Sequence, residues 1–213
     1  MKKNILSIAI LFLSLTAMSQ SKEYFQVMGE TLGGFQNCKT IDDFQALGNK
    51  FSLISNSEQA EWLPLYYHAQ CYIIMSFMET TDVAKKDAYL DVAEKSLEKM
   101  LTLAPAESEI YALQAMFYSA RLVVDPMTRG QQYGALSGQA VGKALALDAN
   151  NPRAKFIKLQ NDMGTAQFFG NDPKAFCPKA KELLEKWDEF KPKSPLHPKW
   201  GKQQVAGIVE SCK

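Results

Sequence analysis

The sequence predicts an all-α protein built from antiparallel pairs of helices that stack on one another. Apolar residues recur at helical spacings of three and four through most of the chain. Prolines follow several of these stretches, where they end a helix because they lack a backbone donor and restrict the preceding residue. No stretch shows the alternation expected of a β strand. The expected helices, about eight or nine in number, span residues 22–36, 41–54, 61–78, 83–103, 107–124, 132–148, 153–168, 176–190 and 198–211.

Residues 1–19 have the composition of a secretory signal peptide. Two lysines come first, an apolar run over residues 5–15 follows, and the small residues Ala17 and Ser19 end the segment. The run is shorter than the roughly 20 residues that span a bilayer. We expect cleavage after Ser19, which leaves one helical domain over residues 20–213 with no membrane span. The junction resembles signal sequences common in Bacteroidota, so we expect export to the periplasm or secretion.

The charges of the chain are nearly balanced. Twenty-four basic and 23 acidic residues give a formal charge of +1, and removal of the leader's two lysines changes this to −1. A chain with so little net charge has no positive electrostatic potential that would attract a polyanion. Nucleic acid is therefore not an expected partner.

Residues 83–124 form the clearest helix pair in the sequence. Leu90, Leu97 and their neighbours make one apolar stripe along the first helix, which Pro105 ends. The second helix, residues 107–124, carries two apolar stripes. A helix that is apolar on two faces needs neighbours on both, so this pair requires further helices beside it.

The spacing within this pair recurs along the chain. Intervals of four, three and five residues separate Ala93, Leu97, Met100 and Pro105, then Ala140, Ala144, Leu147 and Pro152, and then Ala180, Leu184, Trp187 and Pro192. A looser copy comprises Phe44, Gly48, Phe51 and Asn56. This pattern resembles the tetratricopeptide repeat. The resemblance implies a right-handed α-solenoid with divergent repeats over residues 40–192.

Two features of the third helix pair have alternative explanations. Gly134, Gly138 and Gly142 share one helix face, and each costs the helix up to about 1 kcal/mol relative to alanine. We favour close packing against a neighbouring helix over contact of a ligand with bare backbone. Residues 123–134 are expected to form a long connection with Arg129 near its tip, and such loops often carry contacts.

The stacked pairs also suggest how the four cysteines pair. In an oxidising compartment they allow three pairings. Cys177 begins one helix and Cys212 ends the next, and these ends meet in an antiparallel hairpin. Cys38 follows the first helix, and Cys71 lies late in a parallel neighbour. We therefore expect two structural disulfides, Cys177–Cys212 and Cys38–Cys71, each stabilising by roughly 2–4 kcal/mol.

Signals for catalysis or metal binding are weak. His68 and His197 lie far apart, and no histidine or cysteine stands at metal-ligand spacing. No nucleophile elbow and no phosphate-binding glycine loop occurs. We expect no enzyme activity, no metal and no cofactor.

The resemblance to tetratricopeptide repeats implies a peptide-binding groove along the first helix of each pair. The matching positions here are Tyr66, Gln70, Ile73, Met116, Ser119, Phe156, Met163 and Gln167. A non-catalytic scaffold that binds a protein or peptide is therefore the first functional hypothesis. The alternative is a helical protein that binds a small ligand or a glycan, or a diverged enzyme, with a pocket near residues 123–134. The oligomeric state is left open.

Overall fold

A computed structural model describes residues 21–213, and the expected signal peptide lies outside the described residues. The all-α class is confirmed, since no strand occurs in the described part of the chain. The α-helices are α1 (Lys22–Gly33), α2 (Ile41–Ser57), α3 (Leu63–Met78), α4 (Val83–Leu103), α5 (Ser108–Val124), α6 (Pro126–Leu147), α7 (Pro152–Phe168), α8 (Cys177–Glu185) and α9 (Lys202–Ser211). Short 3₁₀ helices are η1 (Gly34–Asn37), η2 (Pro173–Phe176) and η3 (Trp187–Glu189).

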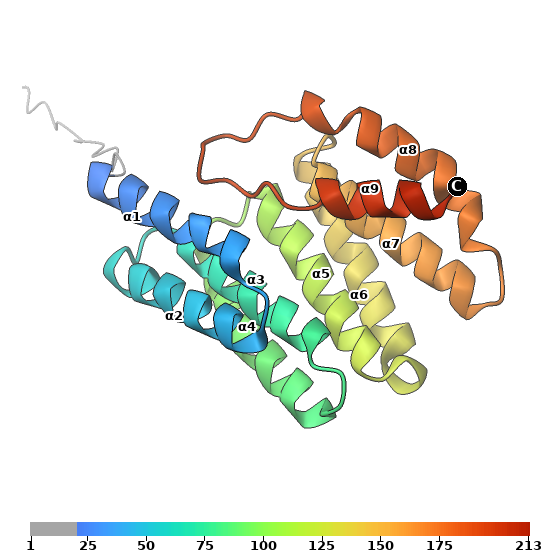
Figure 1. Cartoon of the computed structure of the whole chain (residues 1–213), viewed down its shortest axis with the longest axis horizontal. Coiled ribbons are helices and arrows are strands. Elements are labelled where there is room, and N and C mark those ends of the chain that lie inside the picture. The colour runs from blue at the N-terminus through green and yellow to red at the C-terminus, as the bar shows by residue number, and fades with distance from the viewer. Residues whose placement is uncertain (1–20) are drawn as a thin grey trace, which may run out of the picture.

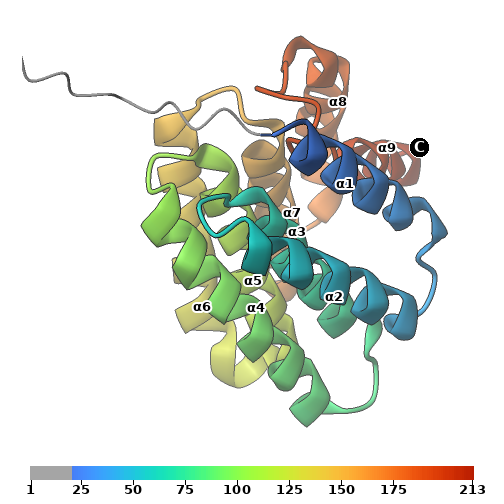
Figure 2. The same ribbon diagram turned by 90° about the vertical axis from the view of Figure 1, so that its left-hand side faces the viewer.

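Consecutive helices pack side by side through the middle of the molecule (Figures 1 and 2). The contact between α5 and α6 is the most extensive, followed by those of α3 with α4 and α2 with α3. Near the C-terminus, α9 packs against α8. Within residues 21–213, no helix is long and apolar enough to span a bilayer.

Apolar side chains form one large core and a second, smaller one. The large core joins α1 to α5 and includes Leu196. Leu196 belongs to residues 190–201, the stretch between η3 and α9, which we call the C-terminal segment. The second joins α5, α6, α7 and the last helices around Phe156 and Trp187. The recurring alanines Ala93, Ala140 and Ala180 are all buried, as expected of residues on a packed helix face.

The long connection expected over residues 123–134 is wrong. Helix α6 begins at Pro126, directly after Asp125, whose carboxylate accepts a hydrogen bond from the Thr128 backbone at 3.3 Å. Proline is tolerated in the first helical turn because that turn's N–H groups have no partner within the helix. Arg129 is therefore a helical residue, and its guanidinium pairs with Asp87 of α4 at 2.7 Å.

The glycines of α6 do not mark a tight helix contact. A Cβ added at Gly138 or Gly142 would meet no atom within 4 Å, and one at Gly134 would meet only Leu122, at 3.6 Å. The expected close packing is absent, because Gly138 and Gly142 are exposed and Gly134 makes only an ordinary contact with α5.

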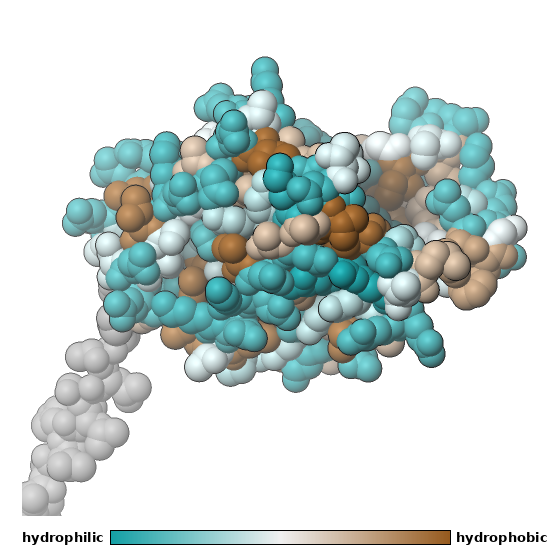
Figure 3. Space-filling view, turned by 90° about the horizontal axis from the view of Figure 1, so that it is seen from below, coloured by the Kyte–Doolittle hydropathy of each residue, from teal (hydrophilic) through white to brown (hydrophobic). Residues whose placement is uncertain are grey.

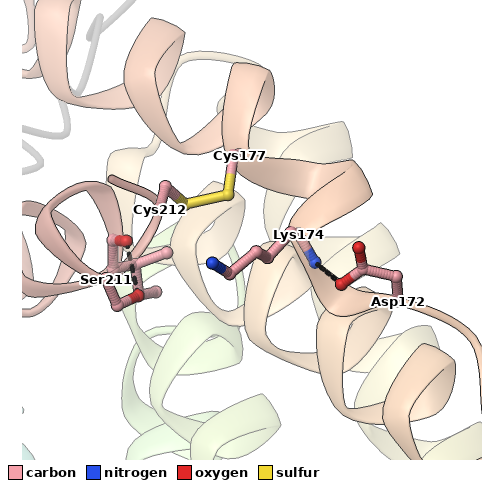
Figure 4. Close-up of a disulfide and its surroundings, with 6 residues drawn as sticks. Asp172, Lys174, Cys177, Ser211 and Cys212 are labelled. Carbon is pink, nitrogen blue, oxygen red and sulfur yellow. Dashed lines mark hydrogen bonds between the residues drawn. A yellow bond between two sulfur atoms is a disulfide. The ribbon is translucent and has the colours of Figure 1, made fainter.

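One of the two expected disulfides is present. Cys177 at the start of α8 is bonded to Cys212 after α9, with Cα atoms 5.9 Å apart (Figure 4). Cys38 and Cys71 are free, so the second expected pair is not formed. The turn η1 precedes Cys38, whose thiol donates to the Gly34 carbonyl at 3.4 Å, while Cys71 is fully buried in α3.

Candidate functional site

The face expected to hold a peptide groove is closed by the C-terminal segment. Tyr66, Ile73 and Phe156 are buried. The Trp200 indole N–H donates to the Tyr66 hydroxyl at 2.9 Å, and the rings of Trp200 and Phe156 lie 6.3 Å apart. Tyr66 and Phe156 therefore belong to the interior, because Trp200, which is 134 residues from Tyr66 in the sequence, packs against both, and Ile73 lies in the large core.

The remaining expected groove residues do not form one open surface. Gln70 is buried, Met116 packs between the two cores, and Ser119 bonds to Asn161 at 3.0 Å. Met116, Ser119 and Met163 are half-buried, and only Gln167 among the eight is exposed. The structure does not bring the eight residues together.

A buried ion pair joins α5 to α7 beneath this segment. The Arg153 guanidinium donates two hydrogen bonds to the Glu109 carboxylate, each at 2.5 Å, and both side chains are almost fully buried. Asn151 donates to the same carboxylate at 3.1 Å. The guanidinium lies 5.0 Å from the centre of the Phe190 ring, which links the pair to the C-terminal segment. Sequence reasoning missed this pair, since its members are 44 residues apart.

Both histidines have structural partners. His68 bonds to Ser96 at 2.8 Å, and burial lowers its pKa to about 4. His197 bonds to Ser194 at 2.7 Å, packs edge-on against Trp62, and has a pKa lowered by burial. Over residues 21–213, no group of three or more histidine, cysteine, aspartate or glutamate side chains could hold a metal ion.

One surface hollow lies at the end of α7, and we call it the phenylalanine pocket. Its volume is about 360 Å³, and it is lined by Asp162, Thr165, Ala166, Phe169, Asn171 and Phe176. Phe169 is 71% exposed, and its neighbour Phe168 is 57% exposed. These two adjacent rings leave apolar surface exposed to solvent beside the hollow. The adjacent phenylalanines before Gly170 are the sequence signal that could have revealed it.

Two lysine side chains, Lys158 and Lys179, contact residues that line the phenylalanine pocket. The Lys179 ammonium lies 5.1 Å from the centre of the Phe176 ring. Lys158 pairs with Asp162 at 2.9 Å, and Lys179 approaches the same carboxylate at 4.0 Å. Two lysines therefore face a single acid, which leaves positive charge at the rim for an anionic ligand.

The second hollow lies between α5 and α6, and we call it the tyrosine groove. Its volume is about 210 Å³, and its lining residues are Tyr111, Gln114, Tyr118, Leu136, Gln139, Ala140 and Lys143. Neither hollow is lined by residues 123–134, where a pocket was expected. In the view of Figure 3, hydrophobic side chains form several separate patches, and a hollow separates the body of the molecule from the lobe on the right.

The described part of the chain is an all-helical protein with a disulfide between Cys177 and Cys212. No protein-family model matches the sequence, and no curated protein matches it. Among solved structures, the HusA haemophore from Porphyromonas gingivalis is similar, with 31% identity and a TM-score of 0.77. The similarity covers 92% of this chain and 96% of that chain. The chain therefore belongs to the same family as HusA.

Proposed function

We propose that the protein is an exported haem-binding protein that works as a haemophore and takes its ligand in the phenylalanine pocket. The observation that carries the proposal is the 31% identity to a haemophore over nearly the full length of both chains. The expected signal peptide and the Cys177–Cys212 disulfide support export, because disulfides persist in oxidising compartments.

The chemistry of the phenylalanine pocket suits haem, a flat apolar macrocycle with two carboxylates. Phe169 and Phe176 offer ring faces for stacking. The ammonium groups of Lys158 and Lys179 stand at the rim, where they would meet the carboxylates. The volume of about 360 Å³ falls within the range of roughly 300–1,000 Å³ typical of small-molecule sites.

The six lining residues include no histidine, cysteine, methionine or tyrosine, the usual axial ligands of haem iron. Stacking and charge would therefore supply the affinity of this pocket.

This proposal replaces the peptide-binding scaffold as the preferred function, since the expected groove face is covered by the C-terminal segment. We retain a tetratricopeptide-like arrangement of the helix pairs as a structural proposal. It is supported by the burial of Ala93, Ala140 and Ala180 at matching positions of three pairs.

The test is a titration of the chain that begins at Gln20 with haem, in which the Soret absorbance reports binding. We expect saturable binding, and we expect the double variant Phe169→Ala/Phe176→Ala to weaken it by about tenfold or more, since two stacked rings are lost. Phe77→Ala is the matched control, because Phe77 is a 42% exposed phenylalanine on α3. Absence of any Soret change in the unaltered protein would refute the function. Unchanged affinity in the double variant would refute the pocket.

A further inference from the structure

The tyrosine groove is built from matching faces of two antiparallel helices. Tyr111, Gln114 and Tyr118 stand at intervals of three and four on α5, so they share one helix face. On α6, Lys143 lies opposite Tyr111, with its ammonium 5.7 Å from the centre of the ring. Near the other end, the rings of Tyr118 and Tyr133 lie 6.2 Å apart. The groove therefore runs along both helices and has an aromatic ring toward each end.

The two tyrosine rings are held in place by the protein. The Tyr111 hydroxyl donates to the Pro105 carbonyl at 2.9 Å. Tyr118 packs against both apolar cores, and its pKa is raised by burial and by the nearby carboxylate of Glu94. Fixed rings lose little conformational freedom when a ligand stacks on them, which favours binding.

Three polar side chains of the groove have no hydrogen-bond or ion-pair partner in the described chain. The side-chain amides of Gln114 and Gln139 make no hydrogen bond within residues 21–213, and Lys143 forms no ion pair there. By contrast, the nearby cations Arg121 and Arg129 are both paired with Asp87. Two amides and one ammonium therefore remain available to a ligand.

We propose that the tyrosine groove binds a single pyranose ring that carries a carboxylate, as in a hexuronic acid. The apolar face of a sugar ring can lie on a tyrosine, and amides both donate to and accept from hydroxyls. The Lys143 ammonium pairs with the carboxylate. The volume of about 210 Å³ is below the roughly 300–1,000 Å³ of sites for larger ligands, so one ring is the unit recognised.

Each feature of this ligand has a counterpart in the groove. A neutral sugar leaves the Lys143 charge without a partner. A plain aromatic acid leaves the amides of Gln114 and Gln139 without hydrogen bonds, although a neutral hydrogen bond adds only modestly to affinity. The site is separate from the phenylalanine pocket, and the two hollows share no lining residue.

The test is an NMR titration of the ¹⁵N-labelled chain from Gln20 onward with glucuronic acid, and with glucose as the uncharged comparison. We expect amide shifts confined to the facing parts of α5 and α6, with glucuronic acid binding about two- to fivefold more tightly than glucose, the range of one exposed ion pair. Lys143→Gln should abolish this preference. Lys50→Gln, a change at another exposed lysine on α2, should preserve it.

A second variant tests the amides separately. Gln114→Ala/Gln139→Ala should weaken both sugars by about tenfold, because two hydrogen bonds are lost, while haem binding stays unchanged. The inference is overturned if glucuronic acid shifts no resonance of α5 or α6. It is also overturned if glucose binds equally well or if Lys143→Gln leaves the preference intact. Loss of haem binding in the double variant would instead show that haem uses this groove, which would contradict both site assignments.

Discussion

The buried pair of Glu109 and Arg153 offers a quantitative test of how α5 and α7 are held together. The side chains are 4% and 2% exposed, respectively. Glu109→Leu removes the carboxylate and leaves the Arg153 guanidinium buried with no counter-charge. Breaking a buried pair in this way costs about 3–5 kcal/mol, because the remaining charge has lost both its partner and its water.

The double variant is expected to give a contrasting result. Replacing both members with apolar side chains of similar size is often close to neutral, since the desolvation cost of the pair is also removed. We therefore expect Glu109→Leu/Arg153→Met to recover most of the stability lost by Glu109→Leu alone. The non-additivity should exceed about 2 kcal/mol, within the range found for residues in direct contact.

The measurement is urea unfolding of Glu109→Leu, Arg153→Met, the double variant and the unaltered protein, monitored by circular dichroism at neutral pH. A loss of 3–5 kcal/mol would lower the melting temperature by about 6–20 °C for a domain of this size. The reasoning fails if Glu109→Leu costs less than about 1 kcal/mol. It also fails if the double variant is as unstable as the two single changes added together.

Three further predictions concern the disulfide, a histidine and two glycines. Reduction of Cys177–Cys212, which closes a loop 35 residues long, should cost about 3–4 kcal/mol in urea unfolding; no change would show that α8 and α9 hold together without it. His68 has a pKa of about 4 in the folded protein against 6.5 in the unfolded chain. Its contribution to the free energy of unfolding is therefore fully present above pH 6.5 and is lost as the pH falls toward 4. An NMR titration that gives a pKa near 6.5 would contradict its burial. Gly201→Ala should destabilise the fold by about 1–3 kcal/mol, because the Gly201 φ is 110° and the added Cβ would lie 2.6 Å from Trp187. Gly138→Ala should stabilise the fold by about 0.5–1 kcal/mol, because an added Cβ there meets no atom within 4 Å. Equal effects of the two changes on the melting temperature would refute the contrast.

Local patterns in the sequence located most of the helices. The span predicted for residues 83–103 matches α4, and the one for 107–124 differs from α5 by one residue. The prediction failed at residues 126–131, where Pro126 was taken as part of a connection although it occupies the first turn of α6. The prediction of a peptide groove was wrong for another reason. The apolar stripes of α3 and α7 look the same in the sequence whether solvent or another segment of the chain covers them.

The sequence by itself determined the helical class, the ends of most helices and the Cys177–Cys212 pairing. These features depend on neighbours within a few turns, or on helix ends that an antiparallel pair brings together. Only the tertiary structure decided which helix faces stay open. The C-terminal segment covers Tyr66 and Tyr67. Their hydroxyls form hydrogen bonds with Trp200 and Leu196, which are 134 and 129 residues away in the sequence, respectively. Such contacts arise from the packing of the whole chain and leave no periodic signal, so the open surfaces became visible only in the folded molecule.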